Sequence, residues 1–523
     1  MKSIISKYYG LIPLLMLLSF FGYQSISFPI HDFANYYFGG QFLVEGHFTS
    51  LCYFPFEFNK AIADAGYTGI FVSYAPNTPF LALIFAPFSL LPIWISKIIF
   101  NSLSIFAFLY SIQKLSSFYQ IKSIYLLLIP IVFFIPIRNE ILFGQLYFLL
   151  FFLLSESWMA YQKNNLKTSA CYLAIAILLK IFPALLLLFP LFTKQFRYLL
   201  YVAGFGLFFL SVSVFFSGFE IWQYFLTAIL SKASNGEISE AYVSNYQSMF
   251  MFLKELLIYE PTLNRATFYN SPAIFHALLL LFKSTLLVFG FFITRKASNF
   301  LLVLSYWILV MVLVSPYGST YTLILLLFPY FGLIQSDCSK TKKIVALLLI
   351  FLANNLPTTI FLKYPFPFSY LRLFVLMLLL TLILRHFHKH LNYKITGIVA
   401  LASAFLAFTF TKRETSYSQY FLEKESPILI YDYQVKAQRL TYSYWNDNGE
   451  NKISIPFNYS NAKPLELKEN QIFHNGILLI SDSGHKRKPL LIDGKYILYL
   501  SDYDRGIGFY TLRKVMVNTT DDE

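Results

Sequence analysis

A single acidic residue stands at the start of the first long polar stretch of the chain. Asp32 lies in the segment FPIHDFANYYFGGQF, which begins at Phe28 directly after an apolar run. A carboxylate at the end of a membrane helix can stay hydrated, and so act as a base, while it faces a substrate held in the lipid. We therefore predict that Asp32 is catalytic. The alternative is that Asp32 and His31 only flank a helix end.

Several other polar side chains in apolar surroundings could take part in the same chemistry. Lys180 is the most unusual, because a lysine inside AIAILLKIFPALLLLFP is costly unless it reaches water or an anion. Snorkelling of its amine to the membrane surface is the alternative. The other residues that we predict to bind substrate are Tyr36, Tyr74, Arg138, Glu140, Gln145, Asn245, Gln247 and Tyr321. Arg138 and Glu140 could instead form a local ion pair, and Gly144 with Gln145 could serve helix packing.

The composition of the chain identifies the medium in which these residues lie. Of 523 residues, 57% are hydrophobic and 13% are charged, and the mean hydropathy is +0.57. Such values are typical of a polytopic membrane protein. The net charge of +14 comes mostly from lysines and arginines in short loops between apolar segments. It therefore indicates orientation in a membrane and not binding to nucleic acid.

The sequence predicts neither a metal site nor a soluble cofactor. Its three cysteines, Cys52, Cys171 and Cys338, are scattered and have neither metal-ligand spacing nor CxxC spacing. There is no Walker loop, no Rossmann fingerprint and no HExxH motif. A soluble nucleotide is therefore not expected as a partner.

The apolar segments predict about thirteen transmembrane helices, judged by the length that a bilayer core requires. The N-terminal run has a basic start but no small-residue cleavage site, so we interpret it as the first membrane helix and not as a signal peptide. Two of the segments are short, are separated near Pro183, and need neighbouring helices around them. The segments after the first lie near 93–113, 122–137, 145–161, 168–180, 182–193, 196–217, 272–294, 298–314, 317–335, 342–360, 366–385 and 393–411.

The segment 73–92, SYAPNTPFLALIFAPFSLLP, decides the sidedness of the chain. If it is a Pro-rich helix at the outer surface, the basic loops all fall on the inner side, as the positive-inside rule requires. If it crosses the membrane, and 168–193 forms one long helix, several of the lysines move outside. We prefer the first arrangement. It places the first loop, 28–79, and the long loop 218–271 on the outer side of the cell membrane.

From residue 412 the composition changes to short strand-like runs separated by turns. The runs include SPILIYDYQV, GILLI, PLLI and KYILYLSDY, and the turns include NDNG, HNG, DSG and DG. We therefore expect an all-α polytopic domain over 1–411 and a small β-rich domain over 412–523. An odd number of spans from a cytoplasmic N terminus places the second domain on the extracytoplasmic side.

The order of several short motifs resembles glycosyltransferase family 87. Asp with YY and Gly in the first loop is followed by Y-x-P-x-x-P and FAPFSLLP, then GQ, LK-x-x-P, N-x-Q-S, and SP before a late helix. The likeness covers roughly residues 10 to 335. Tyr246 interrupts the NQS that the family often has, and Tyr317 and Tyr321 stand where an aromatic residue followed by histidine is often found.

This resemblance implies a GT-C-like membrane fold and an inverting transfer from a polyprenyl-phosphate sugar, with the catalytic acid at Asp32. The family includes bacterial polyprenol-phosphate-mannose mannosyltransferases. The sugar is thus expected to be mannose or another hexose or pentose, and the acceptor a cell-envelope glycan or lipid. Arg138, in a bidentate manner, and Lys180, as a point charge, could neutralise the departing phosphate. A phosphate paired in this way does not require a divalent metal.

Two other classes of membrane protein remain as alternatives. A secondary transporter usually has internal repeats with broken helices in matching positions, and we find no such repeat in the chain. A glycolipid flippase, or a non-catalytic partner in the assembly of cell-surface glycans, is the second alternative. Glycosyl transfer from a labelled polyprenyl-phosphate sugar distinguishes an enzyme from both.

Overall fold

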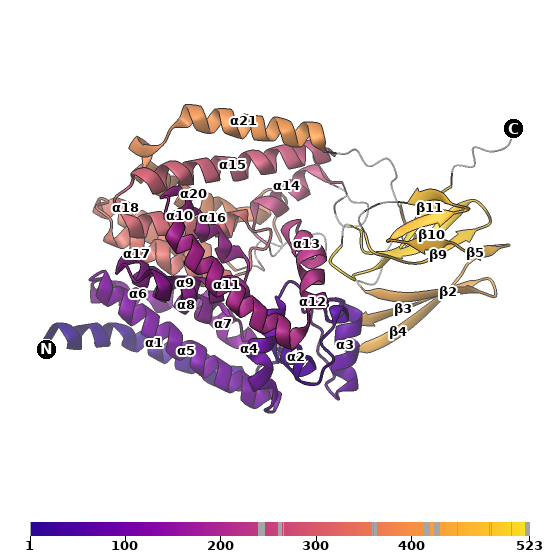
Figure 1. Cartoon of the computed structure of the whole chain (residues 1–523), viewed down its shortest axis with the longest axis horizontal. Helices are drawn as coiled ribbons and strands as arrows, with labels where there is room; N and C mark the ends of the chain where they lie inside the picture. Colours follow the sequence, from indigo (N-terminus) through magenta and orange to yellow (C-terminus); the bar gives the residue numbers. More distant parts are fainter. Residues whose placement is uncertain are drawn as a thin grey trace.

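The computed structural model consists of a helical body followed by a β-rich region (Figure 1). It describes residues 2–238, 246–259, 264, 266–357, 359, 363–411, 419–422, 429–446, 448–480, 482, 484–503 and 505–517. The N terminus lies at the end of the helical body that faces away from the β-rich region. The last helix ends at Phe410 and the first strand begins at Gln419, so the change from helices to strands falls where the composition changes.

Among the described residues, six helices are long and apolar enough to cross a membrane. Two short helices that are bent against each other by 62° make a seventh if both are counted as one span. The protein is therefore helical and suited to a membrane, but the predicted count of about thirteen spans is not confirmed. The six lie in α1 (Lys2–Ser27), α5 (Ile93–Phe118), α11 (Phe196–Ser217), α15 (Pro272–Lys296), α20 (Leu371–His386) with the 3₁₀ turn η5 (Phe368–Tyr370) before it, and α21 (Tyr393–Phe410), and the bent pair is α6 (Ser123–Val132) and α7 (Phe134–Phe143).

The difference comes from predicted spans that are helical but short. A straight span needs about 20 residues, whereas the longest of these helices has 16. The break predicted near Pro183 is present, because α9 stops before a separate 3₁₀ turn that contains this proline. The short elements are α8 (Tyr147–Gln162), α9 (Leu166–Leu179), η2 (Phe182–Leu187), α10 (Leu188–Phe192), α16 (Phe300–Val314), η4 (Tyr321–Leu326), α17 (Leu327–Gln335) and α18 (Lys340–Asn355).

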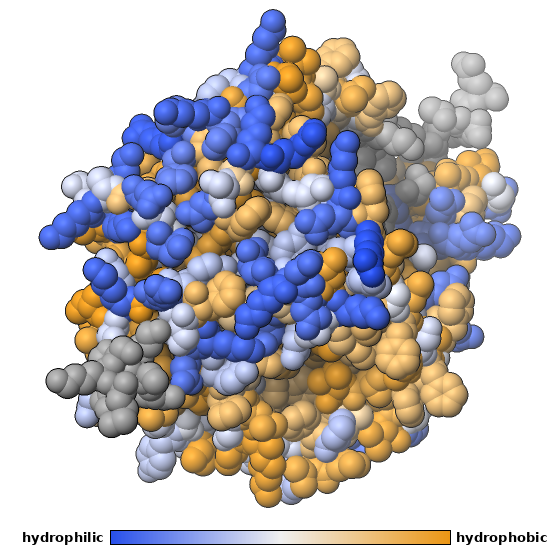
Figure 2. Space-filling model, turned by 60° about the vertical axis from the view of Figure 1, so that its left-hand side comes forward, coloured by the Kyte–Doolittle hydropathy of each residue, from blue (hydrophilic) through white to orange (hydrophobic). Residues whose placement is uncertain are grey.

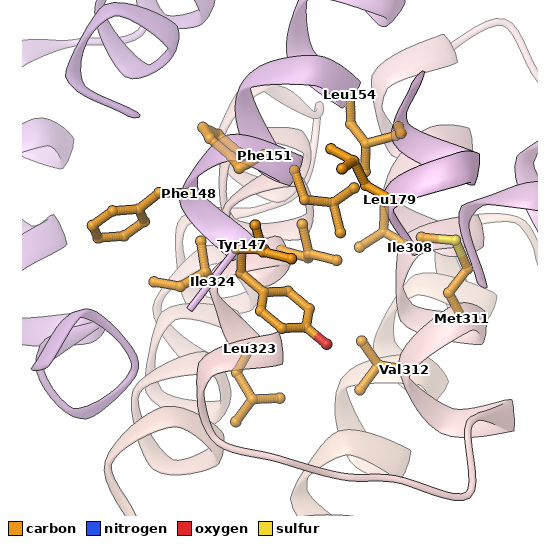
Figure 3. Close-up of a cluster of buried hydrophobic side chains, with 14 of the residues drawn as sticks. Tyr147, Phe148, Phe151, Leu154, Leu179, Ile308, Met311, Val312, Leu323 and Ile324 are labelled. Carbon is orange, nitrogen blue, oxygen red and sulfur yellow. The ribbon is translucent and has the colours of Figure 1, made fainter. Parts of the chain in front are cut away.

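These short helices are stable because they pack against one another in the interior. Every residue of α16 from Leu301 to Leu313 is buried, as expected for a helix that is hydrophobic on all sides. Figure 3 shows the centre of this core, where side chains such as Phe151, Leu179 and Ile308 meet from α8, α9 and α16. Full burial of one such side chain contributes about 1.5–3 kcal/mol. The core therefore holds the ends of these helices in fixed positions.

The first loop, 28–79, is folded into the short helices α2 (Phe33–Val44), η1 (Ser50–Tyr53) and α3 (Pro55–Asp64), and it leads into α4 (Pro79–Ser89). α4 has only 11 residues, in agreement with the prediction that 73–92 does not cross the membrane. α4 packs on α2 because α2 carries two adjacent glycines. A Cβ atom on Gly40 would lie 2.6 Å from the Phe85 backbone, and one on Gly39 would lie 2.4 Å from the Tyr74 ring.

The end of the helical body that carries the N terminus has many hydrophilic residues on its surface. Figure 2 brings this end forward and shows hydrophilic residues gathered on it. The turn between α5 and α6, with Lys122, and the turn between α20 and α21, with Lys389, lie at this end. Basic turns that share one end are what the positive-inside rule requires of the inner side.

The β-rich region consists of three antiparallel sheets. Their strand orders are β1-β11-β10-β9-β5, β2-β3-β4 and β6-β7-β8. The predicted strand-like runs fall on β2, β8, β9 and β10, and the turns NDNG and HNG join β3 to β4 and β7 to β8. The strands are β1 (Gln419–Tyr420), β2 (Ile430–Lys436), β3 (Arg439–Asn446), β4 (Gly449–Pro456), β5 (Ala462–Pro464), β6 (Glu466–Lys468), β7 (Gln471–His474), β8 (Ile477–Ile480), β9 (Lys486–Ile492), β10 (Tyr496–Ser501) and β11 (Thr511–Met516).

Two ion pairs attach the β-rich region to the helical body. Arg487 of β9 pairs with Glu57 of α3 at 3.0 Å. Asp502, which follows β10, pairs with Lys232 of α13 (Leu230–Ser234) at 3.0 Å. The β-rich region thus joins the first loop to the segment that follows α11.

Reversal of the charge of Glu57 should weaken this attachment. Glu57→Arg places a second cation beside Arg487, and the two side chains are only 21% and 28% exposed. We expect the variant to lose about 1–2 kcal/mol in the free energy of unfolding, measured by thermal unfolding in detergent. The double variant Glu57→Arg with Arg487→Glu should recover at least half of this loss.

The control is Glu466→Lys, because Glu466 pairs with Lys468 on the surface, where the Lys468 side chain is 66% exposed. We expect little change in this variant. A double variant as unstable as Glu57→Arg alone would contradict the role of the ion pair.

Candidate active site

Asp32 lies between α1 and α2, where the chain leaves the first span. It is the N-cap residue of α2, but its carboxylate makes no capping hydrogen bond. The side chain is 29% exposed, and His31 Nδ1 lies 3.2 Å from its Oδ1. The His31 backbone is left-handed, with φ of 54°, which few residues other than glycine adopt. The exposed part of the carboxylate can therefore be hydrated.

Gln145 holds the other oxygen of Asp32. Its Nε2 donates to Asp32 Oδ2 at 2.5 Å, and its Oε1 accepts from the Tyr36 hydroxyl at 2.7 Å. Because Tyr36 donates to the amide oxygen, the amide nitrogen is turned toward Asp32. The carboxylate is thus held as an acceptor, which is the state that a general base requires.

A turn at Gly144 brings Gln145 to Asp32. Gly144 follows α7 with φ of 70°, and a Cβ atom on it would lie 2.8 Å from Phe33 Cβ on α2. Both the left-handed backbone and the close approach of α2 require glycine. The Gln145 N–H donates to Glu140 O and closes the turn. The GQ pair therefore serves packing and also positions a side chain on Asp32.

Lys180 stands where α9 ends. Its Nζ donates to Asn77 Oδ1 at 2.9 Å and lies 5.8 Å from the centre of the Tyr36 ring. It also interacts electrostatically with Asp32 and Glu140. A snorkelling lysine would reach open water instead. The amine of Lys180 therefore faces the same group of residues as the Asp32 carboxylate.

Glu140 is a second carboxylate at this site, and it is buried. The residue is 1% exposed, and its Oε1 accepts from the Phe148 N–H at 2.9 Å. Its Oε2 has no hydrogen-bond partner among the described residues. A buried carboxylate oxygen without a partner is costly for folding alone, so this arrangement favours a ligand-binding role.

Two tyrosines complete the group. The rings of Tyr147 and Tyr321 lie 5.3 Å apart, and Tyr321 interacts electrostatically with Tyr36 and Asp32. Burial, first of all, raises the pKa of the Tyr36 phenol well above its usual value. Tyr36 therefore stays protonated and remains a donor to Gln145.

A comparison with models of known protein families gives a match for the middle of the chain. Residues 75–316 match the model of glycosyltransferase family 87. The resemblance found in the motifs is thereby confirmed, and the match implies a membrane glycosyltransferase. No curated protein and no solved structure matches the chain.

The range matched to family 87 contains only part of the site. Glu140, Gln145 and Lys180 lie within it. Asp32 and Tyr36 come before it, and Tyr321 follows it. The link between Asp32 and the matched range is therefore physical, through the hydrogen bond with Gln145.

Two predicted site residues lie apart from this group. Tyr74 is fully buried, and its hydroxyl donates to Thr78 O at 2.8 Å, so it supports the packing of α4 on α2. Arg138 is exposed, and its Nη1 donates to Asn139 Oδ1 at 3.1 Å. It forms no ion pair with Glu140, so the alternative of a local ion pair is wrong.

The N-x-Q-S motif is described only in part. Asn245 lies outside the described residues. Gln247 is 3% exposed and donates from Nε2 to Ser369 O at 2.9 Å. Ser248 caps α14 (Met249–Leu257) and donates to Pro316 O at 2.9 Å. Ser248 thus ties the motif to the segment before Tyr321, and Gln247 ties it to the turn η5.

Sequence reasoning missed Asn77. This residue is 3% exposed and accepts from Lys180. Its neighbour Thr78 donates to Leu178 O at 2.5 Å, two residues before Lys180. The sequence did contain a signal, because Asn77 and Thr78 stand between the two prolines of YAPNTP. A turn fixed by prolines can hold polar side chains in place.

Proposed function

We propose that this protein transfers mannose, or another hexose or pentose, from a polyprenyl phosphate to a hydroxyl group of a cell-envelope glycan or lipid. The reaction takes place on the outer face of the cell membrane. The observation that carries the proposal is the group of Asp32, Gln145 and Lys180, in which a carboxyl group and an amine lie in one site. The match to family 87 supports the class of reaction, and the motif order supports the lipid donor.

Asp32 is the base in this reaction. The acceptor oxygen attacks C1 of the sugar on the face opposite the phosphate, and its proton moves to the Asp32 carboxylate. The bond from C1 to the phosphate oxygen breaks, and its electron pair leaves with the phosphate. The configuration at C1 is therefore inverted.

Lys180 stabilises the negative charge of the leaving phosphate. A fixed amine in a site of low polarity interacts with a phosphate more strongly than it would in water. Asn77 holds this amine in place. Glu140 Oε2 is available to accept a hydrogen bond from a sugar hydroxyl, and Tyr147 and Tyr321 offer aromatic faces beside it.

The proposal is tested with the purified protein in liposomes that contain radiolabelled undecaprenyl-phosphate mannose and a lipid extract of the cell envelope. Transfer of label from the donor to an envelope lipid or glycan is expected. Movement of the labelled donor across the bilayer without transfer would contradict the proposal and favour a flippase.

The orientation of the chain makes a separate prediction. In a variant that lacks the native cysteines, we expect a membrane-impermeant maleimide to label Lys468→Cys from outside the cell, but not Asn165→Cys. Lys468 is exposed on β6, and Asn165 is exposed in the turn between α8 and α9. Labelling of Asn165→Cys in intact cells would reverse the orientation and place the site on the inner side.

A further inference from the structure

Two buried polar side chains of α5 have no role in the mechanism above, yet each bonds to a segment that carries part of the site. Lys97 and Asn101 are four residues apart, so they lie on the same face of the helix. They are only 1% and 5% exposed. Because α5 is apolar enough to cross the membrane, a lysine buried in it is costly. Its retention therefore points to a specific contact.

Lys97 holds the chain just before Asp32. Its Nζ donates to Pro29 O at 2.9 Å and lies 5.6 Å from the centre of the Phe28 ring. Pro29 lies between the end of α1 and the start of α2, so its carbonyl oxygen is outside both helices. The amine therefore fixes the backbone three residues before the carboxylate.

Asn101 supports the segment just before Gln145. Its Nδ2 donates to Ile141 O of α7 at 3.0 Å and to Ser25 Oγ of α1 at 3.3 Å. In a continued helix, Ile141 O would accept from the N–H of Gln145, but that N–H donates to Glu140 O instead. The Asn101 amide thus supplies a donor where α7 ends and its own backbone supplies none.

We propose that Lys97 and Asn101 are positioning residues for the transfer reaction, which together hold Asp32 and Gln145 in register. The inference rests on the proposed function. Asp32 and Gln145 are 113 positions apart, so their hydrogen bond depends on where two separate segments are placed, and α5 is bonded to both. A displacement of about 1 Å at a reacting group can reduce the rate by about 100-fold.

The first test measures transfer from undecaprenyl-phosphate mannose in liposomes by Lys97→Met and by Asn101→Leu. Methionine has nearly the length of lysine, and leucine nearly the size of asparagine, so each variant removes the donor without opening a cavity. We expect kcat to fall about 10-fold to 100-fold in each variant. KM for the donor should change little, because Lys180 and its contacts are kept.

The control is Ser111→Ala. Ser111 is also fully buried on α5, but its hydroxyl donates to Ala107 O of the same helix. It holds no segment of the site, so kcat should be unchanged.

Double variants separate positioning from a general weakening of the fold. If Lys97 acts through Asp32, Lys97→Met should cost little further activity in the Asp32→Asn background. Asn101→Leu should likewise cost little further activity in the Gln145→Leu background. Losses that are the same in both backgrounds would overturn the inference.

A measurement without the donor reports on the turn itself. The His31 side chain is 46% exposed, so a nitroxide on His31→Cys, in a protein that lacks the native cysteines, has room to move. We expect Lys97→Met to make its electron paramagnetic resonance spectrum more mobile, and Ser111→Ala to leave the spectrum unchanged.

The outcomes distinguish this inference from the proposed function. If the wild-type protein transfers label, an unchanged spectrum in Lys97→Met, or wild-type kcat in both Lys97→Met and Asn101→Leu, would overturn the inference alone. A wild-type protein that transfers no label would overturn the proposed function, and the positioning role with it.

Discussion

Asp32→Asn should reduce turnover with the lipid donor by about 10²–10⁴-fold, the usual contribution of a general base. Asparagine keeps the size of the side chain, and its amide oxygen can still accept the hydrogen bond from Gln145. It cannot accept the proton of the acceptor hydroxyl. Donor binding should therefore be largely kept, so that kcat falls while KM for the donor changes little.

The control for this variant is Asp64→Asn. Asp64 is exposed at the end of α3 in the same loop, and it makes no ion pair within the described residues. Its replacement should leave turnover unchanged. Normal turnover in Asp32→Asn would show that the first loop is structural.

Glu140 is the competing carboxylate. Glu140→Gln tests it, because the amide keeps an acceptor for the Phe148 N–H but cannot act as a base. If Glu140 only binds a sugar hydroxyl, the variant should affect KM more than kcat. A loss of kcat in Glu140→Gln as large as that expected for Asp32→Asn would mean that the base has been misassigned.

The parts of the fold that could be predicted from the sequence are those fixed by local patterns. The apolar segments predict helices that are present, and the Gly-containing turns of the C-terminal part separate real strands. The positive-inside rule favours a helix over 73–92 that does not cross the membrane, and the helix found there, α4, has only 11 residues. The predicted count of spans is not confirmed for a physical reason, because an apolar segment of about 15 residues looks the same whether it crosses lipid or lies buried among other helices.

From the sequence, site residues could be predicted only where a charged residue stands in surroundings that are unusual for its type. Asp32 at a helix end and Lys180 in an apolar run stand out in the sequence, and the structure brings both beside Tyr36. The hydrogen bonds that run from Tyr36 through Gln145 to Asp32 could not be predicted. Tyr36 and Gln145 are 109 positions apart, and their contact depends on the turn at Gly144. Arg138 is the opposite case, since a cation next to Glu140 in sequence lies on another face of α7.

The attachment of the β-rich region to the first loop could not be predicted from the sequence either. Glu57 and Arg487 are 430 positions apart, and each occurs in a segment with no motif. Long-range ion pairs of this kind depend on how separate units pack, which no local pattern records. The position of this region against α3 and α13 explains how residues far from Asp32 can stabilise the loop that carries it.

Lys180→Met is expected to have the second large effect, a loss of about 10- to 100-fold in kcat/KM for the lipid donor. Methionine has nearly the length of lysine, so the variant removes the charge without opening a cavity. The estimate follows from the worth of one charge-assisted hydrogen bond, about 1.5–3 kcal/mol. Lys180→Arg should not restore activity, because the guanidinium is broader than the amine and Asn77 Oδ1 offers a single acceptor.

Lys283→Met, which removes a lysine from α15 far from these contacts, is the control and should retain full activity. Equal kcat/KM in Lys180→Met and Lys283→Met would assign Lys180 to the packing of Asn77 alone, and the cation for the leaving phosphate would have to come from elsewhere.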